Sequence, residues 1–278
     1  MPRQSQTQGL LDLGSRLASI PKEFKRFFIL LVWLAGIFPA QAAERAAVSI
    51  AAAGDLTFCL DELNAQFRKV HSNVTLTVTV GASGNFFAQI QRGAPFDVFL
   101  SADMNYPREL VRAGKADGKS LTRYAVGHIV LWTVKPHLVV TNGLGVLTNA
   151  GVRKIAIASP EHAPYGRAAK AALEKAGLWN ALQSRIVIGE NIAQTAQFVE
   201  SGNVDAGIVA LSLVSAPKLK GVGAWWPVPE ELHPRLEQGA VLTRRAETNA
   251  AARVYLDFLR SDEARAVFNR FGFRLPSQ

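Results

Sequence analysis

The segment 81–85, which reads Gly-Ala-Ser-Gly-Asn, has the composition of a backbone anion site. It follows residues 74–80, in which valine and leucine alternate with threonine as in a β-strand, and it precedes a helical pattern that starts at Phe86. The first turn of a helix has unpaired N–H groups and the positive end of the helix dipole, and both attract an anion. Ser83 adds a neutral hydroxyl donor. The segment therefore predicts an anion-binding turn, with an ordinary strand-to-helix turn as the alternative.

Three further strand-to-helix loops carry similar donor chemistry, at residues 53–55, 163–166 and 190–192. In α/β proteins such loops gather at the carboxyl ends of parallel strands, where ligands bind. The first two of the four loops contain no Arg or Lys, and Arg167 directly follows the third. Neutral donors at helix ends suit a small oxyanion, because fixed dipoles stabilise its charge without a counterion. We therefore expect a ligand that is met by helix N-termini from two sides.

The sequence contains no recognisable enzyme motif, although an unidentified hydrolase stays an alternative. Asn85 stands where a G-x-S-x-G nucleophile turn has its second glycine. The five histidines lack metal-ligand spacing, and there is no Walker loop. The single cysteine, Cys59, falls in the apolar pattern of a helix and is predicted to be a buried structural thiol. We predict no catalytic residue, no cofactor and no metal cation, and hence no enzyme.

The N-terminal segment 1–42 has the pattern of an export signal. Basic residues between positions 22 and 26 precede an apolar run over 27–38, and the Ala-Gln-Ala sequence that ends at Ala42 is a small-x-small cleavage pattern. The apolar run is shorter than the about 20 residues that a membrane span needs. We predict cleavage after Ala42 and a periplasmic mature protein, with an uncleaved anchor as the alternative.

The charge of the chain is basic but dispersed. The formal net charge is +9, of which +3 lies before Ala43, so the predicted mature chain carries +6. Because there is no run of Lys and Arg, this charge does not indicate a nucleic-acid partner. It does raise the local concentration of a small anion.

Strand and helix patterns alternate along the mature chain, which predicts an α/β fold with mostly parallel sheets. The predicted strands and the last two predicted helices cover residues 47–52, 74–80, 96–100, 129–134, 155–158, 186–188, 206–211, 238–242, 249–260 and 262–271. The rhythm breaks near His128, and the Pro-rich segment 225–229 is interpreted as a return crossing. We predict a discontinuous lobe I (43–127 and 238–278) and a lobe II (128–237), each a sheet flanked by helices.

Five segments carry a recognisable family pattern, and they cover residues 51–57, 81–86, 93–103, 160–166 and 270–274. In their order along nearly the whole mature chain, they resemble the molybdate-binding periplasmic proteins of ABC importers, in the type II periplasmic-binding-protein group. The resemblance implies two lobes with a tetrahedral oxyanion in the cleft. It also implies a soluble, monomeric receptor that delivers molybdate, and often tungstate, to a membrane permease driven by a cytoplasmic ATPase.

The resemblance further implies which residues contact the oxyanion. Gly54 and Asp55 fall on the ligand positions of the first loop, and Ser83 falls on the hydroxyl position of the second. In the second lobe, the matching positions are Tyr165, whose hydroxyl would reach the anion, and Ile192, whose backbone N–H would donate.

Asp55 departs from the family pattern, which commonly has Ser, Thr or Asn at this position. A carboxylate beside a dianion is repulsive in a dry cleft. Three interpretations are open: Asp55 caps the following helix and offers only its backbone amide, which we favour; it is protonated and donates; or it accepts a proton carried by the ligand. The alternative functions are a receptor for sulfate, phosphate or an organic anion, and an exported enzyme or signalling sensor on the same fold.

Overall fold

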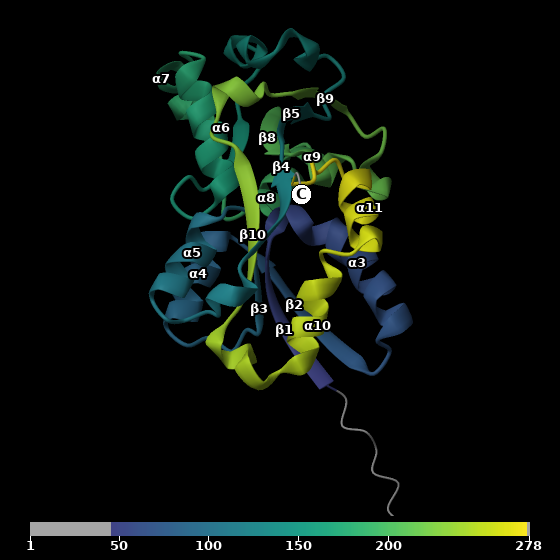
Figure 1. The fold of residues 1–278 in the computed structure, drawn as a ribbon. Coiled ribbons are helices and arrows are strands. Elements are labelled where there is room, and N and C mark those ends of the chain that lie inside the picture. The colour runs from purple at the N-terminus through teal and green to yellow at the C-terminus, as the bar shows by residue number, and fades with distance from the viewer. Residues whose placement is uncertain (1–45, 277–278) are drawn as a thin grey trace, which may run out of the picture. The chain divides into compact units, whose positions relative to one another are not determined.

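The computed structural model describes residues 46–276 of the 278-residue chain, so the predicted signal segment 1–42 lies outside the described residues. The strands are β1 (Ala46–Ala53), β2 (Val74–Gly81), β3 (Val98–Ser101), β4 (Thr122–Gly127), β5 (Ile129–Thr133), β6 (Ile155–Ala158), β7 (Ile186–Gly189), β8 (Ala206–Ala210), β9 (Ala224–Pro227) and β10 (Leu236–Leu242). The helices are α3 (Thr57–Val70), α4 (Ser83–Gln91), α5 (Asn105–Arg112), α6 (Pro164–Lys175), α7 (Trp179–Leu182), α8 (Ile192–Glu200), α9 (Leu211–Val214), α10 (Ala250–Phe258) and α11 (Asp262–Arg270) (Figure 1). Within 46–276, no helix is both long and apolar enough to cross a membrane.

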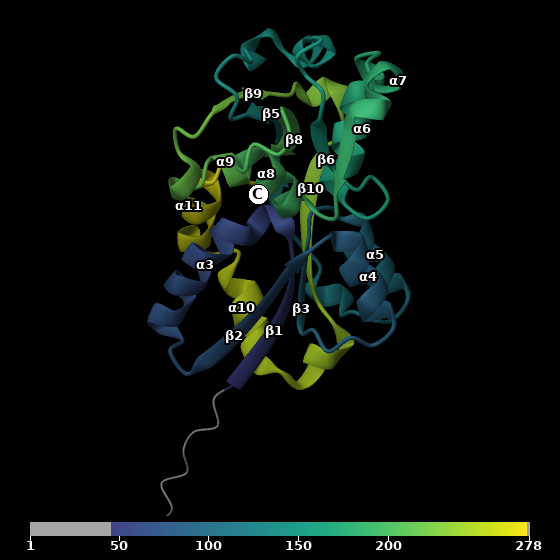
Figure 2. The same cartoon turned by 180° about the vertical axis from the view of Figure 1, so that it is seen from behind.

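The first sheet has the strand order β2-β1-β3-β10-β4. Strand β1 runs parallel to β2 and β3, whereas β10 runs antiparallel to β3 and β4. Successive side chains of a strand point to opposite faces, so Ile50 and Ala52 pack in the cluster that contains Tyr255 and Phe268, while Ala51 packs with Phe86. Helices α3, α10 and α11 therefore cover one face, and α4 and α5 cover the other (Figure 2). Burial on both faces explains the almost continuous apolar run of β1.

The second sheet has the order β7-β6-β8-β5-β9. Strand β6 runs parallel to β7 and β8, and β5 runs antiparallel to β8 and β9. Its core contains the fully buried Trp132, whose indole N–H donates to the carbonyl oxygen of Val222 at 3.0 Å. The small residues Ala168, Ala169 and Ala172 let α6 pack against the same core. The two five-stranded sheets flanked by helices confirm the predicted α/β fold class.

The chain crosses between the sheets at two places. Strand β4 ends at Gly127 and β5 begins at Ile129, so His128 alone joins them. The return runs through residues 228–235, between β9 and β10. The prediction that 225–229 forms the return crossing is therefore wrong in part, because residues 224–227 pair with β5 as an edge strand, where proline is tolerated. The exact division into lobes I and II stays a prediction.

Cys59 is free and fully buried in α3, as its place in the apolar pattern predicted. Burial raises the pKa of its thiol well above the ordinary value. The thiol therefore stays protonated and acts as a small core group.

Candidate functional site

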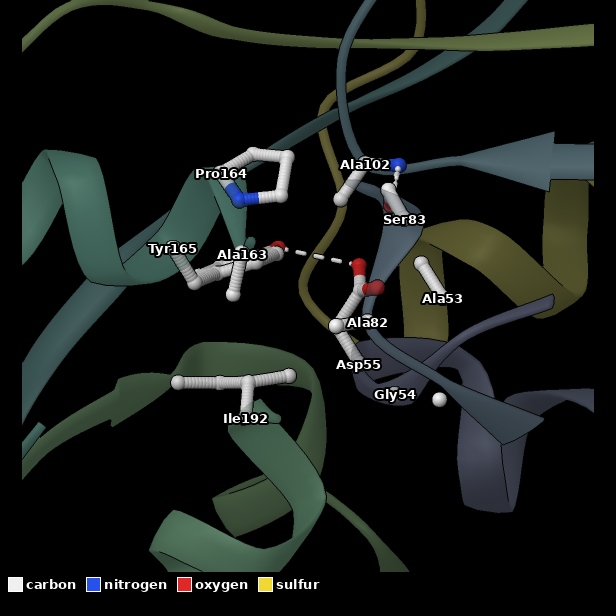
Figure 3. A pocket seen from close by; sticks show the side chains of 11 residues that line it. Ala53, Gly54, Asp55, Ala82, Ser83, Ala102, Ala163, Pro164, Tyr165 and Ile192 are labelled. Carbon is white, nitrogen blue, oxygen red and sulfur yellow. Dashed lines mark hydrogen bonds between the residues drawn. The ribbon is translucent and has the colours of Figure 1, made fainter. Parts of the chain in front are cut away.

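A small cavity lies where strands of both sheets end and the following helices begin (Figure 3). The empty space in and around it, including space open to solvent, is about 180 Å³. It is lined by the turns after β1, β2 and β3 and by the first residues of α6 and α8: Ala53, Gly54, Asp55, Gly81, Ala82, Ser83, Ala102, Ala163, Pro164, Tyr165 and Ile192. All five residues predicted to bind the anion line this one cavity. Their contact with a ligand stays a prediction.

No cation lines the cavity. The lining residues include no Lys, Arg or His, and Asp55 is the acidic residue among them. Arg167 lies in the first turn of α6, close to the cavity, but its guanidinium donates to the carboxylate of Asp103 at 2.5 Å. A ligand in the cavity would therefore contact neutral donors and one carboxyl group.

Asp55 lies in the short 3₁₀ turn Gly54–Leu56 that joins β1 to α3, and it is 1% exposed. Its Oδ2 accepts hydrogen bonds from the Tyr165 hydroxyl at 3.0 Å and from Nε2 of Gln238 at 2.5 Å. Its Oδ1 is buried and has no hydrogen-bond partner among the described residues. The prediction that Asp55 caps the helix is wrong. The residue before α3 is Leu56, no side chain caps α3, and the Asp55 carboxylate points instead to donors from distant segments.

Gln238 is a site residue that the sequence analysis missed. It lies on β10, is fully buried, and its Nε2 donates to both Asp55 and the Tyr165 hydroxyl, the latter at 3.1 Å. The Tyr124 hydroxyl on β4 donates to its Oε1 at 2.6 Å, which orients the amide with the NH₂ group toward Asp55. The available signal was a polar residue directly before Gly239, where the small and apolar half of the strand begins. The register with β4 shifts at this pair.

The protonation of this buried group follows from its surroundings. Burial raises the pKa of Asp55 from 3.8 to about 6, and the hydrogen bonds from Gln238 and Tyr165 offset part of that rise. Burial, followed by the negative charge of Asp55, raises the pKa of Tyr165 well above 10. Tyr165 therefore stays a donor, while Asp55 changes charge around pH 6.

Ser83 is the first residue of α4 and is 1% exposed. Its Oγ accepts a hydrogen bond from the backbone N–H of Ala102 at 3.0 Å, which ties the start of α4 to the end of β3. Within residues 46–276, no group accepts the Ser83 hydroxyl hydrogen, so that hydrogen is available to an anion in the cavity. The residue before the helix, Ala82, has no side chain that competes for the first N–H groups.

The start of α8 presents a backbone donor on the opposite side. The Asn191 side chain caps this helix by accepting from the N–H groups of Ala193 and Gln194, both at 3.0 Å, which leaves the N–H of Ile192 unused by the cap. A Cβ at Gly54 would lie 3.1 Å from the backbone nitrogen of Ala193. Glycine at this position therefore lets the first loop come this close to α8.

Direct hydrogen bonds near the cavity join segments that belong to the two sheets. The backbone N–H of Gly84 in α4 donates to the carbonyl oxygen of His162 at 2.8 Å. The Ser212 hydroxyl on α9 donates to the carbonyl oxygen of Asp55 at 2.7 Å. With the Tyr165–Asp55 bond, these contacts hold the loops of both sheets around the cavity.

The geometry suits capture of a small oxyanion. Three helices, α4, α6 and α8, begin at the cavity and direct their positive ends toward it. A nucleophilic serine needs a histidine or another base hydrogen-bonded to its hydroxyl. The lining residues provide no such base to Ser83. The site is thus built to bind by fixed dipoles.

Comparison with known proteins agrees with this geometry. The chain is 40% identical over 247 residues to the molybdate-binding protein ModA of Azotobacter vinelandii, covering 88% of this chain and 97% of that protein. It is 38% identical over 235 residues to ModA of Rhodobacter capsulatus, covering 84% and 90% of the two chains. A solved structure of the A. vinelandii periplasmic molybdate-binding protein matches with a TM-score of 0.79 and 34% identity, covering 83% of this chain and all of that one.

The family assignment covers nearly all described residues. A sequence model for bacterial extracellular solute-binding proteins matches residues 48–274, which include every residue that lines the cavity. The chain therefore belongs to the bacterial extracellular solute-binding protein family.

Proposed function

We propose that this protein is a periplasmic receptor that binds molybdate, and also tungstate, in the cavity between its two sheets and delivers the anion to an ABC permease. The observation that carries this proposal is the cation-free cavity at the starts of α4, α6 and α8. A dianion held there is stabilised by helix dipoles and neutral donors, which favour one size of tetrahedral oxyanion.

The ligand contacts that we propose use both sides of the cavity. The Ser83 hydroxyl and the backbone of Gly54 and Asp55 serve the anion from the first sheet. The Tyr165 hydroxyl and the N–H of Ile192 serve it from the second. The A. vinelandii and R. capsulatus relatives, both named as molybdate-binding proteins, match this chain along 90% or more of their length, which supports molybdate over other oxyanions.

The organisation that we propose follows from this role. Residues 1–42 act as a cleaved export signal. Residues 43–127 with 238–278 form lobe I, and residues 128–237 form lobe II. The mature protein acts as a monomer without a cofactor and without enzymatic activity, because its task is to close around one anion and present it to the permease.

Thermal unfolding with added oxyanions tests the proposal. Protein expressed from the full-length gene and purified should be heated with molybdate, tungstate, sulfate or phosphate. An anion at a thousandfold excess over its Kd stabilises the native state by about 4 kcal/mol, which for a domain of this size corresponds to a rise in Tm on the order of 10 °C. We expect this rise with molybdate and tungstate and little change with sulfate. Equal rises with sulfate and molybdate would reject the assignment.

A further inference from the structure

The two carboxylate oxygens of Asp55 have different surroundings. Oδ2 accepts two hydrogen bonds, from Tyr165 and Gln238, whereas the buried Oδ1 accepts none from the described residues. Asp55 itself lines the cavity beside Ser83 (Figure 3). An unpartnered polar atom at this depth is unfavourable unless something in the cavity completes its bonding.

No charge near Asp55 compensates for a second anion. The ionisable groups that face it are the Tyr165 phenol on α6, the Tyr124 phenol on β4 and the Cys59 thiol on α3. The pKa of each is raised by burial, so all three are neutral near pH 7. The other polar groups that contact Asp55 are neutral: the Gln238 amide, which donates to Oδ2, and the Ser212 hydroxyl, which donates to the backbone carbonyl. An ionised Asp55 next to a dianion would therefore experience unscreened repulsion.

The Tyr165 hydroxyl adds to the unfavourable energy of an ionised Asp55 beside a dianion. A phenol has one hydrogen, and in this structure Tyr165 donates it to Oδ2 of Asp55. If Tyr165 turns that hydrogen toward an anion, Oδ2 keeps only the donor from Gln238. Binding thus removes a hydrogen bond that stabilises the ionised carboxylate at the moment when a dianion arrives. A proton on the Asp55 carboxyl group removes the charge repulsion and the need for the lost hydrogen bond, because Oδ1–H becomes a donor to the anion.

We propose, on the basis of the oxyanion-receptor function above, that the bound state contains one proton shared between Oδ1 of Asp55 and an oxygen of the anion. The proton is carried by Asp55 or arrives on the anion, and the complex is the same in both cases. No bond other than O–H is made or broken. Asp55 therefore makes this receptor a proton-coupled one, in contrast to a site lined by neutral donors alone.

The proton requirement gives binding a defined pH dependence. With its pKa at about 6, Asp55 of the free protein is ionised above neutral pH, so each molybdate ion must bind together with one proton from solution. Molybdate is a dianion throughout this range. The affinity should fall tenfold for each pH unit, and hence about 100-fold between pH 7 and pH 9.

Calorimetric titration with molybdate tests this inference directly. Kd should be measured for the parent protein at pH 7 and pH 9, and the heat of binding at pH 8 should be measured in two buffers with different heats of ionisation. The difference between the buffers gives the number of protons taken up, which we expect to be close to one. In Asp55→Asn, proton uptake should vanish and Kd should become nearly independent of pH. In Ser83→Ala, binding should weaken at both pH values while uptake stays close to one.

The possible failures are distinguishable. Molybdate binding by the parent protein with no proton uptake and equal affinity at pH 7 and pH 9 overturns the shared proton but leaves the receptor function intact. Uptake that persists in Asp55→Asn overturns the assignment to Asp55. If none of molybdate, tungstate, sulfate and phosphate binds between pH 5 and pH 9, the proposed function itself fails. The proton count of the parent protein decides the question even if Asp55→Asn does not fold.

Discussion

Arg167 donates to the carboxylate of Asp103 at 2.5 Å and so joins helix α6 of the second sheet to the turn that follows β3 of the first. The same guanidinium donates to the hydroxyl of Tyr106 on α5 at 3.1 Å. These groups stand beside the cavity but do not line it. The Arg167–Asp103 pair therefore links the two sheets beside the cavity without contacting a ligand in it.

Removing this link should weaken anion binding by destabilising the closed arrangement. Because the Arg167 side chain is 39% exposed, solvent screening limits the effect of Arg167→Met to about 0.5–1 kcal/mol, or a few-fold in Kd. We expect the weaker binding to appear as faster dissociation of molybdate, measured by stopped-flow fluorescence. Arg112→Met is the control, since its ion pair with Glu109 lies on the exposed surface of α5. Faster dissociation in the control as well would assign the effect to net charge.

Ser83→Ala should weaken molybdate binding by roughly 1.5–3 kcal/mol, the range for a hydrogen bond to a charged partner. It should also lower the stability of the free protein, because the buried N–H of Ala102 loses its acceptor. Ser120→Ala provides a matched control: Ser120 is buried and its Oγ accepts from the N–H of Leu242 at 2.9 Å, but it does not line the cavity. Thermal unfolding should show that both variants are less stable than the parent protein. Calorimetry should show weaker molybdate binding in Ser83→Ala alone. Equal affinity in the two variants would remove Ser83 from the anion contacts.

Tyr165→Phe should likewise raise Kd for molybdate, by roughly 10- to 100-fold, because the anion loses a buried donor. Tyr255→Phe is the control. The Tyr255 hydroxyl is also buried and donates to Asn64 at 2.8 Å, in the core between α3 and α10. Both variants should unfold at lower temperature, and only Tyr165→Phe should bind molybdate weakly. Parent-like affinity in Tyr165→Phe would show that this side chain only packs the two sheets together.

The raised pKa of Asp55 predicts how the stability of the anion-free protein depends on pH. The folded value of about 6 lies above the ordinary value of 3.8, so the folded state holds the proton more tightly than the unfolded chain. Asp55 therefore contributes most to stability below about pH 4, and this contribution is lost as pH rises to about 6. The total is about 3 kcal/mol, from two pKa units at 1.36 kcal/mol each. Above pH 6 the loss is complete.

Asp55→Asn removes this loss, so at pH 8 the anion-free variant should be more stable than the parent protein. At pH 4.5 the difference should fall to about 1 kcal/mol, because only about a third of the loss has occurred there. Urea unfolding at the two pH values measures it. Asp97→Asn serves as the contrasting variant, because the buried Asp97 carboxylate accepts from the N–H of Ser49 and from Arg245, and its loss should destabilise the protein at pH 8. A parent protein more stable than Asp55→Asn at pH 8 would contradict the burial argument.

The proposed export signal predicts the mass of the mature protein. Cells that express the full-length gene should yield a periplasmic form that begins near Ala43. Intact-mass spectrometry of the periplasmic fraction checks this, and substitution of Ala42 by a large residue should cause the precursor to accumulate. Retention of Met1 in the purified periplasmic protein would exclude the proposed cleavage.

The local patterns of the sequence were sufficient for most of the fold. Residues 155–158 form β6 where a short apolar run was predicted, and the buried strands around it follow from the same signal. Strand β4 was missed because it opens with the polar Thr122 and Arg123. Helix α5 was missed because it has few apolar positions and carries Pro107 in its first turn. In both elements, tertiary packing outweighs a weak local pattern.

The cavity residues could be located from the sequence for a similar reason: strand-to-helix loops have local signatures of glycine and small residues. The partners of Asp55 could not. Gln238 reaches Asp55 only because β10 lies within the first sheet, and Tyr124 reaches Gln238 only because β4 pairs with β10. Asp55 looked like a helix cap because aspartate often is one, yet these distant donors outweighed the local preference.

The single-residue link at His128 restricts how the two sheets can move. Since β4 and β5 are separated by one residue, a rotation of one sheet against the other would be concentrated in a few backbone torsions there. The longer return segment 228–235 is tied to this link, because Glu230 pairs with His128 and with Arg274. We therefore expect His128 to act as a pivot, with a displacement that grows with distance from it. A pair of fluorophores beside the pivot would report almost nothing, while a pair on the remote ends of α4 and α6 would record the full amplitude of opening.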